Sequence, residues 1–296
     1  MNDLGMIVNL HKPEAVEMAR RLLRWGQANG CSFLLPHLEA SALTAAGLSD
    51  EEWLNTVKLA VVIGGDGTFL RAARYVLDSD IVLHGINLGH LGFLASSKPE
   101  EAECDLKSIL EDRFDVLNRR VLRCVLYRDG VPRYTIYALN DVVLSKNAIA
   151  RLLHIEVQFN GRFFGILPAD GVIISSPTGS TAYALSAGGP IIPPHLDSML
   201  LAPLCAHTLY SRPLIAAATD RISLIPRSSS RDITLTQDGQ LAYEVFTDDR
   251  IDVDLPPDKL IRTVVLPGRN FLDLLQEKLG DRKSTRLNSS HGRRSR

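Results

Sequence analysis

The chain has 296 residues, of which 45% are hydrophobic and 23% charged, a composition typical of a globular protein with one large or two medium-sized domains. The formal net charge is −1, and no apolar run approaches the ~20 residues needed to cross a bilayer. Because the N-terminus also lacks the basic region and long apolar stretch of a secretory signal, we expect a soluble, cytoplasmic protein.

Up to residue 116, short apolar segments alternate with longer amphipathic ones. We predict strands over residues 5–10, 31–36, 58–63 and 81–86, and helices over 13–29, 68–77 and 99–114. Strands that alternate with helices indicate a parallel sheet that is covered by helices on both faces.

After residue 116 the sequence is rich in β-forming residues and in the dipeptides of tight hairpins. These dipeptides are Asp129-Gly130, Asn160-Gly161 and Asp238-Gly239. Their density favours an antiparallel sandwich or a multi-sheet domain. Near the end, a strand is predicted over 260–267 and an amphipathic helix over 271–279, which suggests that the C-terminus packs back on the first domain.

The last sixteen residues, 281–296, contain six Lys or Arg residues and one Asp, so the rest of the chain is mildly acidic. A basic segment of this kind can be an arm that binds nucleic acid. We favour the interpretation that it is foreign to the fold or disordered, because it follows a complete helix and has no apolar periodicity. It is therefore left out of the predicted fold.

The four cysteines are scattered along the chain, with no C-x-x-C pair: Cys31, Cys104, Cys124 and Cys205. Spacing of this kind predicts reduced thiols and not a disulfide framework or a zinc site. We expect Cys124 and Cys205 in the core. No H-E-x-x-H motif is present, so the sequence predicts no metal site built by the protein alone.

A glycine turn, "GGDGT" at 64–68, separates the predicted buried strand 58–63 from an amphipathic helix. Glycines allow close approach of the backbone, and the N–H groups at the start of a helix favour a phosphate. Neither G-x-x-x-x-G-K-[ST] nor G-x-G-x-x-G is present. Asp66 at this position either caps the helix or takes part in chemistry, since a carboxylate beside phosphates needs a metal or a proton to accept.

Two further segments combine polar groups in unusual places. Residues 168–190 begin with Asp170-Gly171 and continue as a loop of hydroxyls and glycines in which Tyr183 offers a stacking face, suited to a sugar, an adenine or a phosphate. The other interpretation is a solvated connection. Asn140-Asp141 interrupts a strand-like run, which indicates either a bulge or turn, or a functional site.

Taken together, these motifs resemble the bacterial NAD kinases. The shared segments occur in the family's order and approximate spacing: "GGDGT", "GINLGHLGFL", "LNDVVL", "DGVIISSPTGSTAYALSAGGPI", "HTLYSRPL" and "DGQ". The resemblance extends over about residues 5–280. It implies an N-terminal Rossmann-like α/β domain with a parallel sheet over 1–116, an antiparallel β-rich NAD-binding domain over 117–262, and a C-terminal segment, 263–280, that returns to the first domain.

The resemblance also implies the reaction, which is transfer of a phosphate, the γ-phosphate of ATP or one from polyphosphate, to the 2′-hydroxyl of the adenosine ribose of NAD. Asp66 would be the base that takes the hydroxyl proton, a role that a catalytic Asp plays in protein kinases. The residues implied to bind the nucleotides are Asp66, Gly67, Arg71, Asn140, Asp141, Arg151, Asp170, Thr181, Ala182, Tyr183, Ala184, Leu185, Ser186 and Gln240. Mg²⁺ is expected to arrive mainly with ATP.

Two alternative functions are weighed against this interpretation. A lipid kinase that uses the same glycine turn is disfavoured, because no membrane-binding amphipathic stretch is apparent. A silent NAD(P)-binding regulator is disfavoured by the intact Asp66.

The family forms dimers and tetramers, so a homo-oligomer is expected, with no nucleic-acid or membrane partner. Many members have an Arg where this chain has Leu88 and a Glu where it has Asp141.

Overall fold

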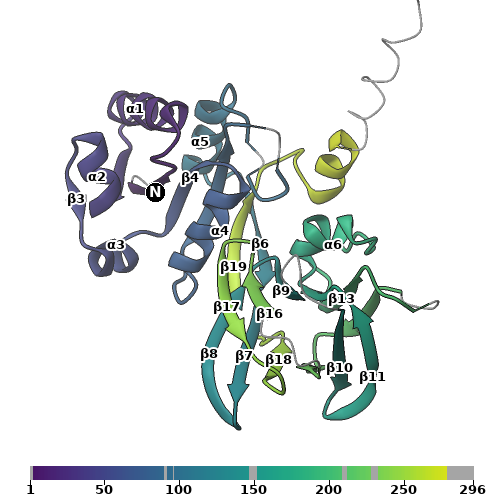
Figure 1. Ribbon diagram of the computed structural model, residues 1–296. Coiled ribbons are helices and arrows are strands. Elements are labelled where there is room, and N and C mark those ends of the chain that lie inside the picture. The colour runs from purple at the N-terminus through teal and green to yellow at the C-terminus, as the bar shows by residue number, and fades with distance from the viewer. Residues whose placement is uncertain are drawn as a thin grey trace, which may run out of the picture. The chain divides into compact units, whose positions relative to one another are not determined.

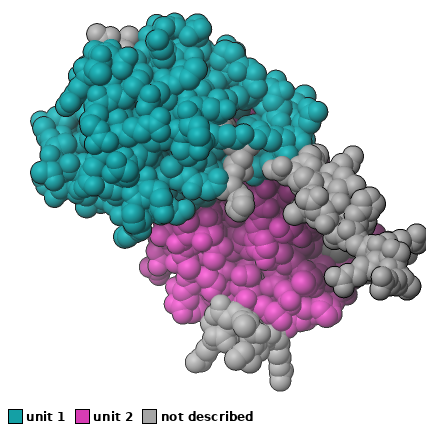
Figure 2. Space-filling view, turned by 90° about the horizontal axis from the view of Figure 1, so that it is seen from above, with its two compact units in different colours: residues 1–72, 80–117, 263–296 teal, residues 73–79, 118–262 magenta. Residues whose placement is uncertain are grey.

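A computed structural model of the chain (Figure 1) describes residues 3–89, 92–95, 97–146, 152–208, 212–227 and 233–278. The chain forms two compact units, coloured separately in Figure 2: unit 1 contains residues 1–72, 80–117 and 263–296, and unit 2 contains 73–79 and 118–262. Residues 73–79 belong to unit 2 although they follow residues of unit 1 along the chain. The tail 281–296 lies outside the described residues.

Unit 1 is built around a seven-stranded sheet with the order β3-β2-β1-β4-β5-β19-β6. Its strands are β1 (Asp3–Val8), β2 (Ser32–Pro36), β3 (Gly47–Leu48), β4 (Leu59–Gly64), β5 (Val82–Asn87), β6 (Asp115–Arg120) and β19 (Leu260–Val265). Its helices are α1 (Pro13–Ala28), α2 (His37–Leu43), α3 (Asp50–Thr56), α4 (Asp66–Tyr75), α5 (Ala102–Leu110) and a C-terminal helix over 271–278. The strands from β3 to β5 pair in parallel, which confirms the predicted α/β class.

Burial explains these elements. Every residue of β4 is buried, as expected for a parallel strand with both faces covered. Helix α1 begins with Pro13 and buries one stripe, Ala15, Met18, Ala19 and Leu22, at the spacing of a single helix face. These side chains pack in one core with Leu4, Met6 and Ile63 of the sheet.

Unit 2 consists of two six-stranded antiparallel sheets, with the orders β11-β10-β15-β18-β7-β8 and β14-β13-β12-β9-β16-β17. Its strands are β7 (Leu122–Arg128), β8 (Val131–Ala138), β9 (Asp141–Lys146), β10 (Leu153–Phe159), β11 (Arg162–Ala169), β12 (Gly171–Ser175), β13 (Ser198–Leu204), β14 (Leu214–Ala217), β15 (Ile222–Pro226), β16 (Ile233–Gln237), β17 (Leu241–Val245) and β18 (Arg250–Asp254). Residues from both sheets share one apolar core, so the predicted antiparallel β-rich domain is confirmed.

All three predicted hairpins are present. Asp129-Gly130 joins β7 to β8, Asn160-Gly161 joins β10 to β11, and Asp238-Gly239 joins β16 to β17. In each pair both residues have φ between 50° and 77°, the left-handed conformation that such tight hairpin turns favour; the first two turns have two residues and the third, 238–240, has three.

All four cysteines are free thiols, as predicted. Cys124 is buried in the core of unit 2, whereas the expectation for Cys205 is wrong, since it is exposed at the end of β13. Within the described residues, no helix is long and apolar enough to span a bilayer.

Candidate functional site

The glycine turn lies where the strand order of the parallel sheet reverses. From β1 the chain moves to β2 and β3 on one side and returns to β4 and β5 on the other, so β1 and β4 are neighbours at a switch point. Open α/β sheets bind ligands at the carboxyl ends of the strands at such a point. Gly64 is the last residue of β4 and Asp66 the first of α4, which places the carboxylate at this edge.

The Asp66 side chain is held by a segment that follows β5. Its Oδ1 accepts a hydrogen bond of 3.1 Å from the backbone N–H of Ala95, 29 positions along the chain. The backbone of Gly92 lies so close that a Cβ at this position would overlap the carboxylate. The contact with Ala95 is tertiary and not a helix cap, and the side chain remains partly exposed. Asp66 is therefore a positioned carboxylate.

The same turn suits an anion. Gly65 C=O accepts the N–H groups of Thr68 and Phe69, which closes the first turn of α4, and the exposed Gly67 carries no side chain to shield it. Gly64 leaves room for the Thr68 side chain, which a Cβ would overlap. The start of this ten-residue helix therefore offers the positive end of the helix dipole to a phosphate.

Arg71 points to the end of the neighbouring strand. Its Nη2 donates to the carbonyl of Val8, the last residue of β1, at 2.9 Å and to Glu39 Oε1 at 3.3 Å. The Arg71 side chain is 45% exposed and that of Glu39 only 4%. The Arg71 guanidinium thus lies at the carboxyl edge of the sheet, and Glu39 neutralises part of its charge. Leu88 is partly buried against the core of unit 1.

In unit 2, the turn at Asn140-Asp141 is fastened by Asp238. The Asp238 carboxylate accepts the backbone N–H groups of Leu139 at 3.3 Å, Asn140 at 2.7 Å and Asp141 at 3.2 Å. The backbone N–H of Asp238 in turn donates to the carbonyl of Asp141. One buried side chain therefore fixes the conformation of the turn, whereas the sequence suggested Asp238 only as part of a hairpin.

The hydroxyl-rich loop packs on the other side of this turn. It continues β12 as the short 3-10 helix η1 (Thr178–Thr181) and the short helix α6 (Tyr183–Ser186). Ser176 N–H donates to the carbonyl of Asn140, and Ser176 Oγ donates to that of Leu139 at 2.5 Å. A Cβ at Gly179 would overlap the Asn140 carbonyl. Several hydroxyls of this loop therefore build the fold and do not face solvent.

The residues predicted to line adenine and ribose follow η1. Thr181 Oγ1 donates to the carbonyl of Thr178 at 3.1 Å, and Ala184 is fully buried. Tyr183 is 50% exposed and Leu185 40% exposed, an unusual share for large apolar groups on so short a helix. An exposed aromatic ring of this kind is suited to stacking on a planar ligand.

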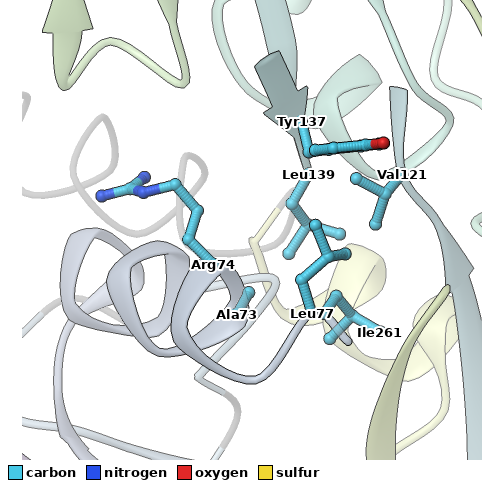
Figure 3. Close-up of a pocket in the computed structure, with 7 residues that line it drawn as sticks. All are labelled: Ala73, Arg74, Leu77, Val121, Tyr137, Leu139 and Ile261. Atoms are coloured by element: carbon cyan, nitrogen blue, oxygen red, sulfur yellow. The ribbon is translucent and has the colours of Figure 1, made fainter. Parts of the chain in front are cut away.

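Gln240 is held by a residue that the sequence reasoning missed. Arg74 Nη2 donates to Gln240 Oε1 at 2.6 Å, and Arg74 Nη1 lies 3.8 Å from the buried Asp238 carboxylate. Figure 3 shows that the guanidinium points away from an apolar pocket that Leu77, Leu139 and other residues line at the base of its side chain. Arg74 is identified only by its contacts with Gln240 and Asp238 in the structure, because in the sequence it looks like an ordinary residue of an amphipathic helix.

Asp170 lies at the opposite end of the same sheet. Strands β9 and β12 are antiparallel, with Asp141 opposite Ser175 and Ser145 opposite Gly171, so roughly 15 Å of strand separates Asp170 from the Asn140 turn. Asp170 Oδ1 pairs with Lys146 Nζ at 2.8 Å. The two groups can therefore contact only different parts of an extended ligand. Arg151 lies outside the described residues.

Burial raises the pKa values of two carboxylates in unit 2. Burial and, to a smaller extent, the nearby Asp238 carboxylate together raise the pKa of Asp141 to about 7. Burial also raises the pKa of Asp238, against the lowering effect of the three backbone N–H groups and of Arg74. Strongly shifted acids in a polar cluster are typical of functional sites.

No group of three or more His, Cys, Asp or Glu side chains among the described residues is arranged to hold a metal ion.

Comparison with known proteins identifies the family. The ATP-NAD kinase N-terminal domain family matches residues 4–114, and the ATP-NAD kinase C-terminal domain family matches 139–263. An NAD kinase of Geotalea daltonii is 36% identical over 280 residues, which cover 94% of this chain and 98% of the relative. An NAD kinase of Acetivibrio thermocellus is 39% identical over 288 residues, which cover 95% and 98%.

Two solved structures share the fold. Yeast NADH kinase complexed with NADH superimposes with a TM-score of 0.85 at 24% identity, covering 100% of this chain and 90% of that one. An NAD kinase from Archaeoglobus fulgidus in complex with ATP superimposes with a TM-score of 0.72 at 22% identity, covering 93% and 99%. The motifs, the two family matches and the relatives agree, and the chain belongs to the NAD kinase family, the phosphotransferases that make NADP from NAD and ATP.

Proposed function

We propose that this chain transfers the γ-phosphate of ATP to the 2′-hydroxyl of the adenosine ribose of NAD, with Asp66 as the general base. The observation that carries the assignment is the position of Asp66, a partly exposed carboxylate at the anion-binding start of α4. No Lys or Arg in the described part of the chain forms an ion pair with it. A carboxylate that is not neutralised by a cation can accept a proton.

In the reaction, the 2′-hydroxyl oxygen attacks the γ-phosphorus as its proton passes to Asp66 Oδ2 or Oδ1. The bond from phosphorus to the β–γ bridging oxygen breaks, and ADP leaves with the electron pair. Phosphoryl transfer of this kind depends mainly on alignment and on stabilisation of charge. The positive end of the α4 helix dipole and the guanidinium of Arg71 are placed at the carboxyl edge of the sheet to stabilise that charge.

The residues of unit 2 would hold NAD. We assign the adenosine to the Asn140-Asp141 turn and to the exposed face of residues 181–186, with Tyr183 as the stacking group and Gln240 as a hydrogen-bonding group. Asp170, at the far end of the sheet, is assigned to the nicotinamide side, and Arg151 is assigned as a further cationic contact to the nucleotide.

Mg²⁺ would enter as part of the substrate, MgATP, and neutralise charge on the triphosphate. We further propose a homodimer or homotetramer in the cytoplasm. The alternatives are a lipid kinase, which would phosphorylate a lipid in place of NAD, and a silent NAD(P)-binding regulator, which would form no phosphorylated product.

The test is a steady-state assay of the purified full chain with ATP or polyphosphate as donor and NAD or NADH as acceptor, with the product identified by mass spectrometry and phosphorus NMR. We expect ATP-dependent formation of NAD phosphorylated at the adenosine 2′-oxygen. NAD binding without phosphorylated product, or phosphorylation of a diacylglycerol in place of NAD, would overturn the proposal.

A further inference from the structure

The segment that holds Asp66 is itself held by the C-terminus. Segment 92–98, of which the structure describes every residue except 96, lies in the connection between β5 and α5, and its Ala95 and Gly92 contact the Asp66 carboxylate. Ala95 is packed tightly on the sheet, because a Cβ at Gly85 of β5 would overlap it. Any movement of this segment would therefore change the position of the carboxylate.

Arg269 is the main contact from the C-terminal side. Its Nη1 donates to Ser97 Oγ at 2.9 Å and to Asp105 Oδ2 at 2.7 Å, and its Nη2 donates to Glu101 Oε2 at 2.8 Å. Ser97 is completely buried, and its Oγ also lies 3.1 Å from the Nε2 atom of the buried His84. The guanidinium thus fixes the end of segment 92–98 and the start of α5 at once.

Ser97 continues the sheet beside β5. Its N–H donates to the carbonyl of Gly85 at 3.1 Å, and its carbonyl accepts the N–H of Asn87 at 2.8 Å. The bond from Ala95 to Asp66 lies only two residues before Ser97 along the chain. Arg269 therefore acts on a backbone that is already in register with the sheet.

The C-terminal helix over 271–278 adds contacts to the same segment. The ring of Phe271 lies 6.0 Å from that of Phe93, and Lys278 Nζ lies 4.3 Å from the centre of the Phe93 ring. Glu277 pairs with Lys98 at 2.8 Å. These contacts connect both sides of the 92–98 segment to residues more than 170 positions later in the chain.

We propose that the C-terminal segment 266–278 is a positioning element for the catalytic base. Arg269 and Phe271 hold segment 92–98 against the Asp66 carboxylate, so that the base stays in place for the 2′-hydroxyl. This proposal rests on the proposed function, because it gives the C-terminal segment a role in a reaction in which Asp66 takes the proton.

Three variants of the full chain test the proposal: Arg269→Met, which removes all three hydrogen bonds, Arg269→Lys, which keeps the charge, and Phe271→Ala, which removes a partly exposed ring. The control is Arg123→Met in unit 2, which breaks a comparable two-bond pair with Asp254. We expect Arg269→Met to lower kcat about tenfold or more with the KM for NAD within twofold. Arg269→Lys should recover part of kcat, and the control should leave it unchanged.

Two further readouts exclude a merely structural effect. Amide hydrogen exchange at Ala95 should accelerate in Arg269→Met and Phe271→Ala but not in the control. In an Asp66→Asn background, Arg269→Met should change the residual kcat less than twofold, because the group that it positions is already absent.

The outcomes separate the two proposals. If Asp66→Asn lowers kcat strongly but Arg269→Met and Phe271→Ala leave kcat and Ala95 exchange unchanged, the positioning role is wrong and the base assignment stands. The same conclusion follows if Arg269→Met lowers kcat by the same factor in the Asp66→Asn background as it does in the parent enzyme. If Asp66→Asn itself keeps near-native kcat, the base assignment of the proposed function has failed.

Discussion

Substitution of Gly92 by Ala is expected to disable the enzyme without unfolding it. A Cβ built on Gly92 would overlap Asp66 Oδ1, its nearest atom, and would lie 2.5 Å from Cγ and 2.6 Å from Oδ2, which is at least roughly 1 Å short of an ordinary contact. Gly92 has no positive φ, so an alanine causes no backbone strain there. The carboxylate is the end of a short side chain and can rotate away. We therefore expect the base to move by about 1 Å while the fold is kept.

A displacement of about 1 Å in a reacting group lowers kcat by up to about 100-fold, equivalent to ~2.7 kcal/mol in the activation free energy. The assay is NADP formation at saturating NAD and ATP, together with NAD affinity by calorimetry and the melting temperature. The matched control is Gly89→Ala in the same loop, where the nearest atom to a new Cβ is Asn87 Oδ1 at an ordinary 3.7 Å. A Gly92→Ala enzyme that melts within about 3 °C of the parent and keeps kcat within twofold would refute the reasoning.

Three further predictions concern unit 2 and the substrate metal. Arg74→Met should raise the KM for NAD about tenfold, because a charged hydrogen bond to Gln240 is lost, while Arg123→Met should not; equal KM values in both variants would contradict the role of Arg74. Asp141 has a pKa of about 7 in the folded protein against an ordinary value near 3.8, so the unfolded chain releases this proton first as the pH rises. Its contribution to the free energy of unfolding should therefore fall by at most ~4 kcal/mol between pH 4 and 7. In denaturant titrations, Asp141→Asn should stabilise the protein more at pH 8 than at pH 5. A stability difference between variant and parent that does not change with pH would contradict the raised pKa of Asp141. EDTA should abolish turnover but leave the melting temperature unchanged, since the metal enters with ATP; a lower melting temperature would indicate a metal that supports the fold.

Local features of the sequence were sufficient for much of the fold. Apolar strands that alternate with amphipathic helices predict the parallel sheet. The dipeptides at Asp129, Asn160 and Asp238 predict the three hairpins, because tight turns with positive φ favour those residue types. Asp66 could be singled out because a carboxylate is unexpected in a glycine turn beside a helix start.

Contacts between distant residues could not be predicted in this way. Asp238 fastens the Asn140 turn across 98 positions, and Arg269 reaches Ser97 across 172. Neither leaves a periodic signal, because each depends on which strands become neighbours. The different burial of Cys124 and Cys205 has the same origin, since exposure at a strand end depends on what covers it.

Asp66→Asn, compared with Asp78→Asn at an exposed position just after the same helix, tests the central claim most directly. Asn keeps the size and the acceptor for Ala95 N–H but cannot take the proton of the 2′-hydroxyl. The measurement is the single-turnover rate at saturating NAD and ATP, with the NAD dissociation constant determined separately. We predict a rate at least about 100-fold lower with NAD affinity within threefold, and no change in the control. A near-native rate in Asp66→Asn with NAD bound normally would contradict the assignment of Asp66 as the base.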